Sequence, residues 1–154
     1  MEQLIVGKSL EMQLAALLDT LPSDATVSYM VTRLNEGEEA TIVASSKETI
    51  VHTGASMVKT LILEYVFHLA AQEQLDLNDT IALSRSPRVE GAGALMELVG
   101  NHSFSYLELC RLMMVLSDNW ATNLLIQALG MENINARAEQ LGLEHFEINR
   151  MMMD

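Results

Sequence analysis

Apolar residues near the start of the chain recur at helical spacing and then give way to two short β-branched runs. Leu4 to Leu21 carries one helical apolar stripe, and Pro22-Ser23-Asp24 ends it. Ala25 to Leu34 is rich in Thr, Val and Tyr, and Ala40 to Ser45 has a similar composition. Glu36-Gly37-Glu38 supplies a turn between the two runs. The pattern therefore predicts one helix followed by a β-hairpin.

From Ser56 onward the apolar spacing is almost entirely helical. The predicted helices are Met57 to Glu73, Gly93 to Val99, Ser105 to Leu116, Asn119 to Leu129 and Glu132 to Leu141. A helix, a hairpin and a helical cluster predict an α+β fold in a single domain. Residues 1–50 would form its mixed part and residues 51–154 its helical part.

A lone two-stranded sheet is marginal in water unless more strands or a helix cover it. Its free edge presents unpaired backbone groups to other chains. Self-association or strand exchange through this edge therefore stays open. The 11 methionines, including Met151 to Met153, are expected to be flexible core filler rather than a binding surface.

Composition narrows the classes of partner. The 154 residues are 49% hydrophobic and 19% charged, which fits a globular domain. A formal net charge of −12 argues against nucleic acid or an anionic membrane, because both require clustered Lys and Arg. A cationic or neutral small substrate is compatible with this charge.

The sequence shows no metal or disulfide pattern. Cys110 is the single cysteine and lies among apolar residues, so it is expected to be a packing residue. The histidines are scattered without the spacing of a metal site, and no cofactor is expected. Met1 to Val6 lacks the pattern of a signal peptide, and no window approaches about 18 apolar residues. We therefore expect a cytoplasmic protein, with an exported parent left open.

The candidate chemistry begins at Ser56-Met57-Val58-Lys59, where a predicted helix starts. Residues three apart share a helix face, so Lys59 can bring its amine to the Ser56 hydroxyl. A lysine can act as base for a serine only if its pKa is lowered, and the apolar positions between Leu61 and Phe67 predict the buried helix that this requires. Backbone N–H groups at the helix start would favour an oxyanion.

Ser117-Asp118-Asn119 lies on a predicted loop between two helices. There Ser117 can relay a proton, Asn119 can offer its amide to a substrate carbonyl, and Asp118 fits a helix cap. Taken alone, Ser56 could be a helix cap with a solvated Lys59, and Ser117 an interhelical turn. Both motifs together favour a serine acyl-transfer site.

These motifs resemble those of class A β-lactamases and related penicillin-recognising serine hydrolases. The resemblance is densest in Ser103 to Leu125, and Thr53 to Lys59 resembles the nucleophile helix of the family. It implies the β-lactamase-like fold. It also implies acylation of Ser56, with Lys59 as base, Ser117 as proton shuttle and Asn119 as substrate contact.

The chain departs from the family pattern in two places. Ile148-Asn149-Arg150 resembles the beginning of the omega loop of the family, with Arg150 as the anchoring arginine. The glutamate that activates the deacylating water is expected two residues later, where this chain has Met152, and Asp154 is the nearest downstream carboxylate. No Lys-Ser/Thr-Gly sequence occurs, so we expect a C-terminally truncated domain that lacks the last strands and helix of the family.

The resemblance implies a hydrolase of β-lactam or peptide-like amides, of the kind that gives antibiotic resistance, with a Ser56 acyl-enzyme and poor deacylation. Two alternatives stay open. One is a peptidase or esterase for D-amino-acid peptides, which would use the same residues. The other is a catalytically inactive fragment or folding module in which Ser56 and Ser117 are relics.

Overall fold

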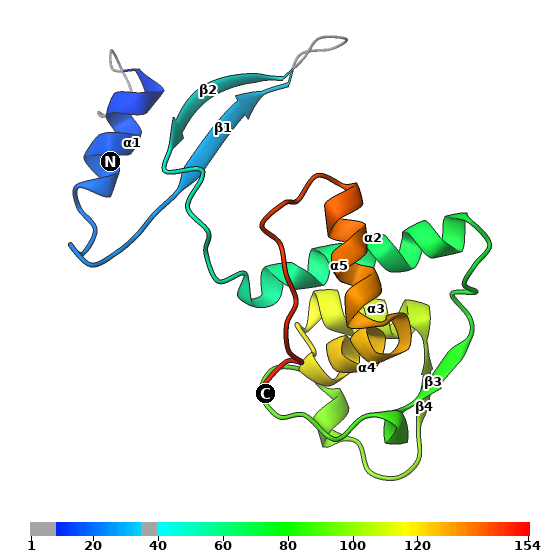
Figure 1. Cartoon of the computed structure of the whole chain (residues 1–154). Coiled ribbons are helices and arrows are strands. Elements are labelled where there is room, and N and C mark those ends of the chain that lie inside the picture. The colour runs from blue at the N-terminus through cyan, green and yellow to red at the C-terminus, as the bar shows by residue number, and fades with distance from the viewer. Residues whose placement is uncertain (1–8, 35–39) are drawn as a thin grey trace. The chain divides into compact units, whose positions relative to one another are not determined.

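The computed structural model describes residues 9–34 and 40–154 of the chain. These residues fall into two compact units, Met1–His52 and Thr53–Asp154 (Figure 1). Within the described ranges, each helix is too short or too polar to cross a membrane.

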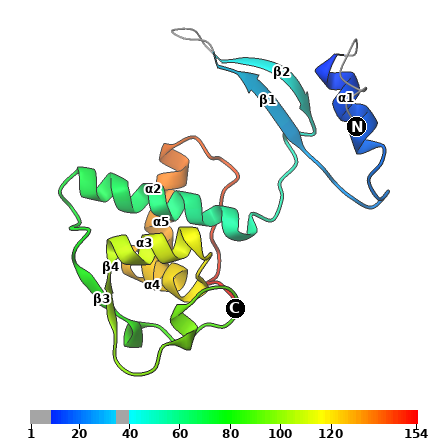
Figure 2. The same cartoon turned by 180° about the vertical axis from the view of Figure 1, so that it is seen from behind.

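The first unit begins with α1 (Leu10–Leu18), whose start is capped by Ser9. The Ser9 hydroxyl accepts a hydrogen bond from the Met12 backbone N–H at 3.4 Å. The helix lies against strand β2 of the same unit, an arrangement visible in Figures 1 and 2. No residue of α1 is buried, and Leu17 is 61% exposed. The predicted apolar stripe is therefore only partly covered by the described residues.

The predicted hairpin is confirmed in the first unit. β1 (Tyr29–Arg33) pairs antiparallel with β2 (Thr41–Ser46), and the register shifts after Val31. The predicted turn at Glu36-Gly37-Glu38 lies outside the described residues. Ala44 on β2 is buried, so one position of this small sheet is fully covered.

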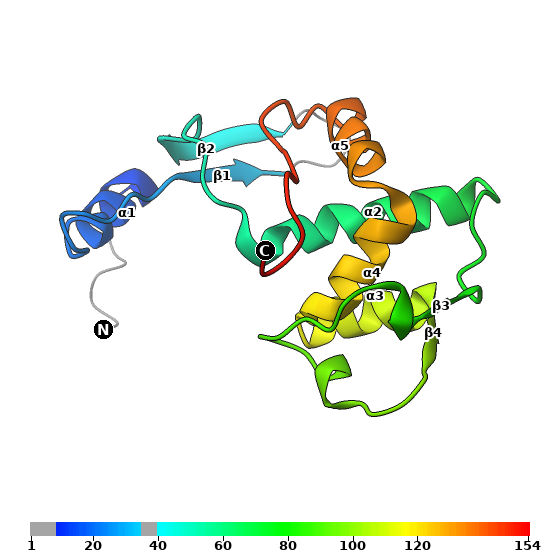
Figure 3. The ribbon, with the colours of Figure 1, turned by 60° about the horizontal axis from the view of Figure 1, so that its bottom comes forward.

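The second unit is a helical cluster along α2 (Val58–Ala71). This helix contacts α3 (Tyr106–Val115), α4 (Asn119–Leu129) and α5 (Met131–Gln140), and Figures 1 and 3 show the four helices gathered together. An ion pair between Arg137 of α5 and Glu64 of α2 adds a polar link between two of them. Four of the five helices predicted from Ser56 onward are thus present, with boundaries shifted by at most two residues.

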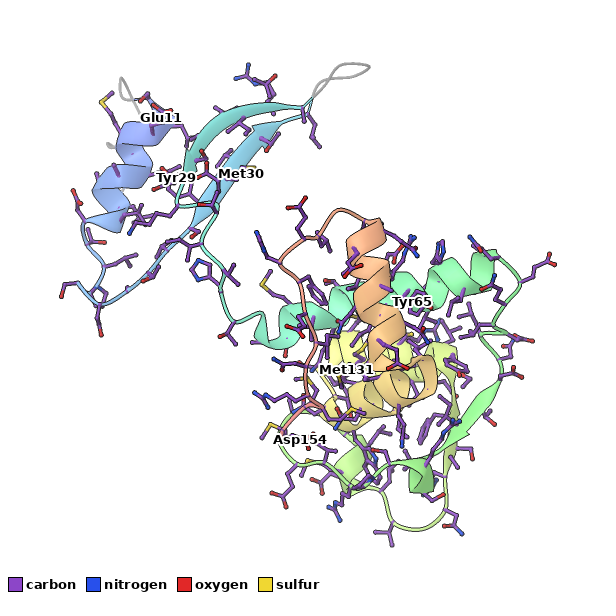
Figure 4. All side chains as sticks on the ribbon, viewed as in Figure 1. Glu11, Tyr29, Met30, Tyr65, Met131 and Asp154 are labelled. Atoms are coloured by element: carbon purple, nitrogen blue, oxygen red, sulfur yellow. The ribbon has the colours of Figure 1, made fainter. Side chains whose placement is uncertain are left out.

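The core of this unit is apolar and dense, and α4 runs through it. Residues 119–126 of α4 are all buried, which identifies it as the central helix. Its neighbours contribute fully buried side chains from α2, α3 and α5: Ile62, Val66, Leu109, Met113 and Ile134. Tyr65 on α2 and Met131 at the start of α5 are partly buried against this core and are labelled in Figure 4. Polar side chains on α4 are consequently held in fixed positions.

The segment between α2 and α3 differs from its prediction. β3 (Thr80–Ala82) pairs with β4 (Ser103–Ser105), a ribbon at the edge of the cluster in Figure 2 that the sequence analysis did not predict. The predicted helix from Gly93 to Val99 is wrong, since only the short 3-10 helix η4 (Leu95–Glu97) forms there. Gly93 has φ +128°, which is incompatible with a right-handed helix.

The last residues of the chain are tied to the helical cluster by a side-chain amide. The Ile148 backbone N–H donates to Asn135 Oδ1 at 2.9 Å, and Asn135 Nδ2 donates to the Ile148 carbonyl at 2.9 Å. The Asn135 side chain thus satisfies both backbone hydrogen-bonding groups of Ile148, as a neighbouring β-strand would do. The segment from Ile148 to Asp154 therefore starts from a fixed point on α5.

Candidate active site

Ser56 lies in a single 3-10 turn, η2 (Ala55–Met57), directly before α2. Its side chain is exposed, and its Oγ lies 3.0 Å from Ser117 Oγ. The residue that caps α2 is Met57, and no side chain caps that helix. The interpretation of Ser56 as a helix cap is therefore wrong.

Ala55, just before the serine, has φ +43°, in the left-handed region. A non-glycine residue holds this conformation only when the surroundings enforce it, at a cost of about 1–3 kcal/mol. Such strain is typical of functional backbone. The Ser56 hydroxyl that follows this strained residue contacts Ser117, in the loop after α3.

Lys59 is 2% exposed, so the alternative of a solvated lysine is wrong. Its ammonium donates three hydrogen bonds, to the Ser117 carbonyl at 2.7 Å, to Ser117 Oγ at 2.8 Å and to Asn119 Oδ1 at 3.0 Å. Every N–H of the ammonium thus has an acceptor.

The environment favours the neutral form of this lysine. Burial lowers the pKa of Lys59 below its ordinary value, and the negative charge of Asp118 opposes part of that shift. A larger fraction of the side chain is therefore neutral near physiological pH than for an exposed lysine. A neutral amine is the form that can accept a proton from a hydroxyl.

Ser117 connects the serine and the lysine. It lies between α3 and α4 with φ +54°, another left-handed non-glycine position. That geometry turns both its carbonyl and its hydroxyl toward Lys59. The hydrogen-bonded path from Ser56 to Lys59 runs through the Ser117 hydroxyl.

Asp118 holds this loop in shape, in agreement with the predicted helix cap. Its Oδ1 accepts the Ala121 N–H at 2.9 Å and so caps α4. Its Oδ2 accepts the N–H groups of Ala94 and Leu95 at 2.7 and 2.9 Å. One carboxylate, 1% exposed, therefore joins the loop before α4 to the loop around η4.

Gly93 makes room for this carboxylate. A Cβ at position 93 would lie 2.3 Å from the Asp118 carboxylate and 2.7 Å from its Cα. Such contacts are far inside van der Waals distance, so only glycine fits against Asp118. Because the Asp118 carboxylate also binds the Ala94 and Leu95 N–H groups, it explains why residues 93–99 do not form an α-helix.

Asn119 is 5% exposed and is the first residue of α4. Because the Lys59 ammonium can only donate, the Asn119 oxygen faces it, which leaves the amide nitrogen on the other side. There the single contact of Nδ2 within the described part of the chain is a long one, 3.5 Å to the Glu90 carbonyl. The amide can therefore still donate a good hydrogen bond to a ligand.

Asn123 is a site residue that the sequence analysis missed. It lies one turn after Asn119 on α4 and is 4% exposed. Its Oδ1 accepts the Met152 N–H at 2.7 Å, and its Nδ2 donates to the Met152 carbonyl at 3.1 Å. The spacing of four from Asn119 was the available signal, because it places both amides on one face of the helix.

Arg150 and Met152, which the sequence resemblance assigns to an omega loop, lie on the segment that Asn123 binds. Arg150 Nη1 donates to the Asp154 carbonyl at 2.7 Å, and the Met151 N–H donates to Asp154 Oδ2 at 3.3 Å. Arg150 and Asp154 thus close a turn around Met152. The Met152 backbone, not its side chain, makes the hydrogen bonds to α4.

Other candidate groups lie outside this chemistry. Cys110 is 2% exposed and its pKa is raised to about 11 by burial, so it stays a protonated packing residue. Among residues 9–34 and 40–154, no three His, Cys, Asp or Glu side chains gather closely enough to hold a metal ion.

The chain is similar to curated and solved β-lactamases and to PBP-A. It is 31% identical over 97 residues to beta-lactamase BRO-1 of Moraxella catarrhalis, across 58% of this chain and 31% of that protein. The solved structure of PBP-A matches with a TM-score of 0.76 and 26% identity, across 94% of this chain and 53% of PBP-A. A PBP-A mutant in an acyl-enzyme complex with penicillin G matches equally well, at 0.76 and 27%.

A β-lactamase from Sphaerobacter thermophilus also matches, with a TM-score of 0.70 and 27% identity, across 84% of this chain and 48% of that one. The chain therefore spans about half the length of these solved structures. The predicted α+β, β-lactamase-like fold is confirmed by these likenesses.

A family model described as the beta-lactamase enzyme family matches residues 9–154. That range contains both motifs, Ser56 to Lys59 and Ser117 to Asn119. The resemblance that these motifs indicate is thereby confirmed, and this protein belongs to the beta-lactamase enzyme family.

Proposed function

We propose that this chain carries the acylation site of a serine hydrolase that attacks β-lactams. The supporting observation is the hydrogen-bonded path from Ser56 through Ser117 to a buried Lys59, with steps of 3.0 and 2.8 Å. Such a path gives a serine what it lacks alone, a base that can take its proton during attack.

In the first step, Ser56 Oγ forms a bond to the carbonyl carbon of the β-lactam amide. The Ser56 proton passes to Ser117 Oγ while the Ser117 proton passes to Lys59 Nζ. The amide C–N bond then breaks, and the proton returns from Lys59 through Ser117 to the leaving nitrogen. The product is an ester of Ser56 in which the ring has opened.

The partners of Lys59 support this direction of transfer. A neutral amine has two N–H donors and one lone pair. Of its three partners, two are carbonyl-type oxygens, on Ser117 and Asn119, that cannot donate. Only the Ser117 hydroxyl can turn and donate to the lone pair. The neutral site is therefore already arranged to receive a proton along that bond.

Two groups would orient the substrate. The Asn119 amide nitrogen, with its long contact to Glu90, would donate to a carbonyl in the acyl side chain. The backbone N–H of Ser56, at the start of the helical segment that continues into α2, would face the developing oxyanion. Both roles require a rigid donor. The buried helix α4 would hold the Asn119 amide, and the strained turn at Ala55 would hold the Ser56 N–H.

A β-lactam is favoured as substrate because a solved relative, a PBP-A mutant, forms an acyl-enzyme complex with penicillin G. The experiment is intact-mass spectrometry of the chain after incubation with penicillin G. We expect an increase equal to one penicillin molecule in the wild type and no increase in Ser56→Ala. Ser84→Ala, at another serine that is exposed, is the matched control and should label normally.

A folded wild-type sample without adduct would contradict the proposal and favour the inactive folding module. Adduct formation that persists in Ser56→Ala would place the nucleophile elsewhere. Circular dichroism of each sample separates a folded, unreactive protein from an unfolded one.

We further propose that acylation outpaces deacylation. The position where β-lactamases carry the water-activating glutamate is Met152, whose thioether cannot accept a proton from water. With a chromogenic cephalosporin we expect a burst of about one equivalent, followed by much slower turnover. A steady rate equal to the burst rate would show that another group activates the water.

A further inference from the structure

We propose that Ser28 and His52 form a second nucleophilic site, which accepts the acyl group of small activated esters. The Ser28 hydroxyl and His52 Nε2 are hydrogen-bonded at 2.7 Å. Both residues belong to the first compact unit, Met1–His52, whereas Ser56 belongs to the second. The inference therefore goes beyond the proposed function and is tested separately from it.

The backbone of the first unit brings the two side chains together. Ser28 directly precedes β1, which pairs antiparallel with β2. After β2 the chain makes a tight turn, in which the Lys47 carbonyl accepts the Ile50 N–H at 3.1 Å. Lys47 has φ +52°, a left-handed conformation that a non-glycine residue adopts only when its surroundings enforce it. His52 follows this turn and contacts the residue at the start of the hairpin.

The hydrogen bond gives the Ser28 hydroxyl a base. A serine hydroxyl alone is a weak nucleophile, and an adjacent imidazole is the group that most often takes its proton. In the neutral tautomer with its proton on Nδ1, His52 accepts from Ser28 through Nε2. During attack, Ser28 Oγ forms a bond to the ester carbonyl carbon and its proton passes to Nε2. The bond from that carbon to the leaving oxygen breaks, the leaving oxygen takes the proton from Nε2, and the acyl group stays on Ser28.

The surroundings of the pair define its substrate class. Ser28 is half-buried and His52 is exposed, so a small molecule can reach both. Within residues 9–34 and 40–154, no carboxylate hydrogen-bonds the other ring nitrogen of His52, so the pair is a dyad rather than a triad. Loss of the charged carboxylate from a catalytic triad lowers kcat by about 10⁴. The dyad is therefore suited to esters with a good leaving group and not to amides.

The first test labels the nucleophile with an alkyl fluorophosphonate, which bonds to an activated serine oxygen and releases fluoride. The protein is the full chain carrying Ser56→Ala, so that the other nucleophile is absent. Intact mass and peptide mapping should show one phosphonyl group, on Ser28. Adding His52→Gln should slow this labelling about 100-fold, because glutamine can keep a hydrogen bond to Ser28 but cannot take its proton.

The second test uses an ester of the proposed class, p-nitrophenyl acetate, and measures release of p-nitrophenolate. The Ser56→Ala protein should release it about tenfold faster than the protein that carries Ser28→Ala as well. Equal rates of release would overturn the inference.

Matched controls are Ser45→Ala, at a half-buried serine of β2, and His145→Gln, at an exposed histidine. Added to Ser56→Ala, each should leave the labelling rate unchanged. The inference is overturned if the folded Ser56→Ala protein is not labelled, is labelled at another residue, or is labelled equally fast with His52→Gln. Circular dichroism establishes that each variant is folded. The penicillin adduct of the wild type reports on the proposed function alone, so either proposal can fail while the other stands.

Discussion

Replacing Lys59 by methionine is expected to slow acylation by penicillin by a factor of about 10³ or more. Methionine keeps an unbranched chain in a position that is 2% exposed, so the packing of α2 is largely retained. What disappears is the proton acceptor at the end of the Ser56–Ser117 path. The rate of adduct formation by intact mass measures the loss.

The control for this variant is Lys47→Met, which removes an exposed lysine in the first unit. It should acylate at the wild-type rate. If folded Lys59→Met protein acylates at a rate within a factor of about ten of the wild-type rate, another group takes the proton.

The same mechanism fixes the sign of the pH dependence. Only neutral Lys59 accepts a proton, so the acylation rate should rise with pH as the ammonium is lost. Because burial lowers the pKa of Lys59, the midpoint should fall below that of an ordinary lysine. The rising limb should vanish in Lys59→Met. A wild-type acylation rate that does not rise with pH would contradict the assignment of Lys59 as base.

Much of the site was predictable because its candidate catalytic residues lie in two short sequence motifs. Ser56 and Lys59 are three residues apart at a helix start, and Ser117 and Asn119 flank a helix cap. Helical spacing predicted that Lys59 would reach Ser56 directly, whereas the Lys59 ammonium hydrogen-bonds Ser117, and Ser117 in turn contacts Ser56. The structure adds that the hydrogen-bonded path passes through Ser117, and this depends on a left-handed backbone at Ser117 that no propensity scale favours.

The unpredicted features depend on contacts between distant parts of the chain. The segment from Gly93 to Val99 has a helix-like apolar pattern, yet the Asp118 carboxylate takes two of its backbone N–H groups. Strands β3 and β4 have three residues each, too few for a period of two to be recognised. Asn123 acts on the backbone of Met152, whose place beside α4 is set by tertiary structure.

Removing the Asp118 carboxylate is expected to destabilise the protein by about 3 kcal/mol, the largest loss of stability that we predict. Asp118→Ala would leave three backbone N–H groups, of Ala94, Leu95 and Ala121, without their acceptor, and the bonds to Leu95 and Ala121 are buried. It would also remove the cap of α4. Urea unfolding followed by circular dichroism measures the change.

Two further variants separate the charge from the shape of this contact. Asp118→Asn keeps one oxygen acceptor but turns an N–H₂ group toward backbone donors, so it should recover only part of the loss. Gly93→Ala leaves the carboxylate in place but pushes a Cβ against it, and should destabilise comparably. Asp76→Ala is the control, because that carboxylate accepts from Asn78 in an exposed turn, and its loss should change stability by less than about 1 kcal/mol.

The acylation rate should fall together with stability in the Asp118 variants, even under conditions where they remain folded. The Asp118 carboxylate bonds backbone N–H groups of Ala94, Leu95 and Ala121, and so fixes the loop that carries Ser117 and the helix that begins with Asn119. A displacement of that loop lengthens both steps of the Ser56–Ser117–Lys59 path at once. If a folded Asp118→Ala protein acylates at the wild-type rate, the α3–α4 loop keeps its geometry without the carboxylate. We expect the opposite, because Ser117 in this loop has a left-handed backbone that is unfavourable unless its surroundings enforce it.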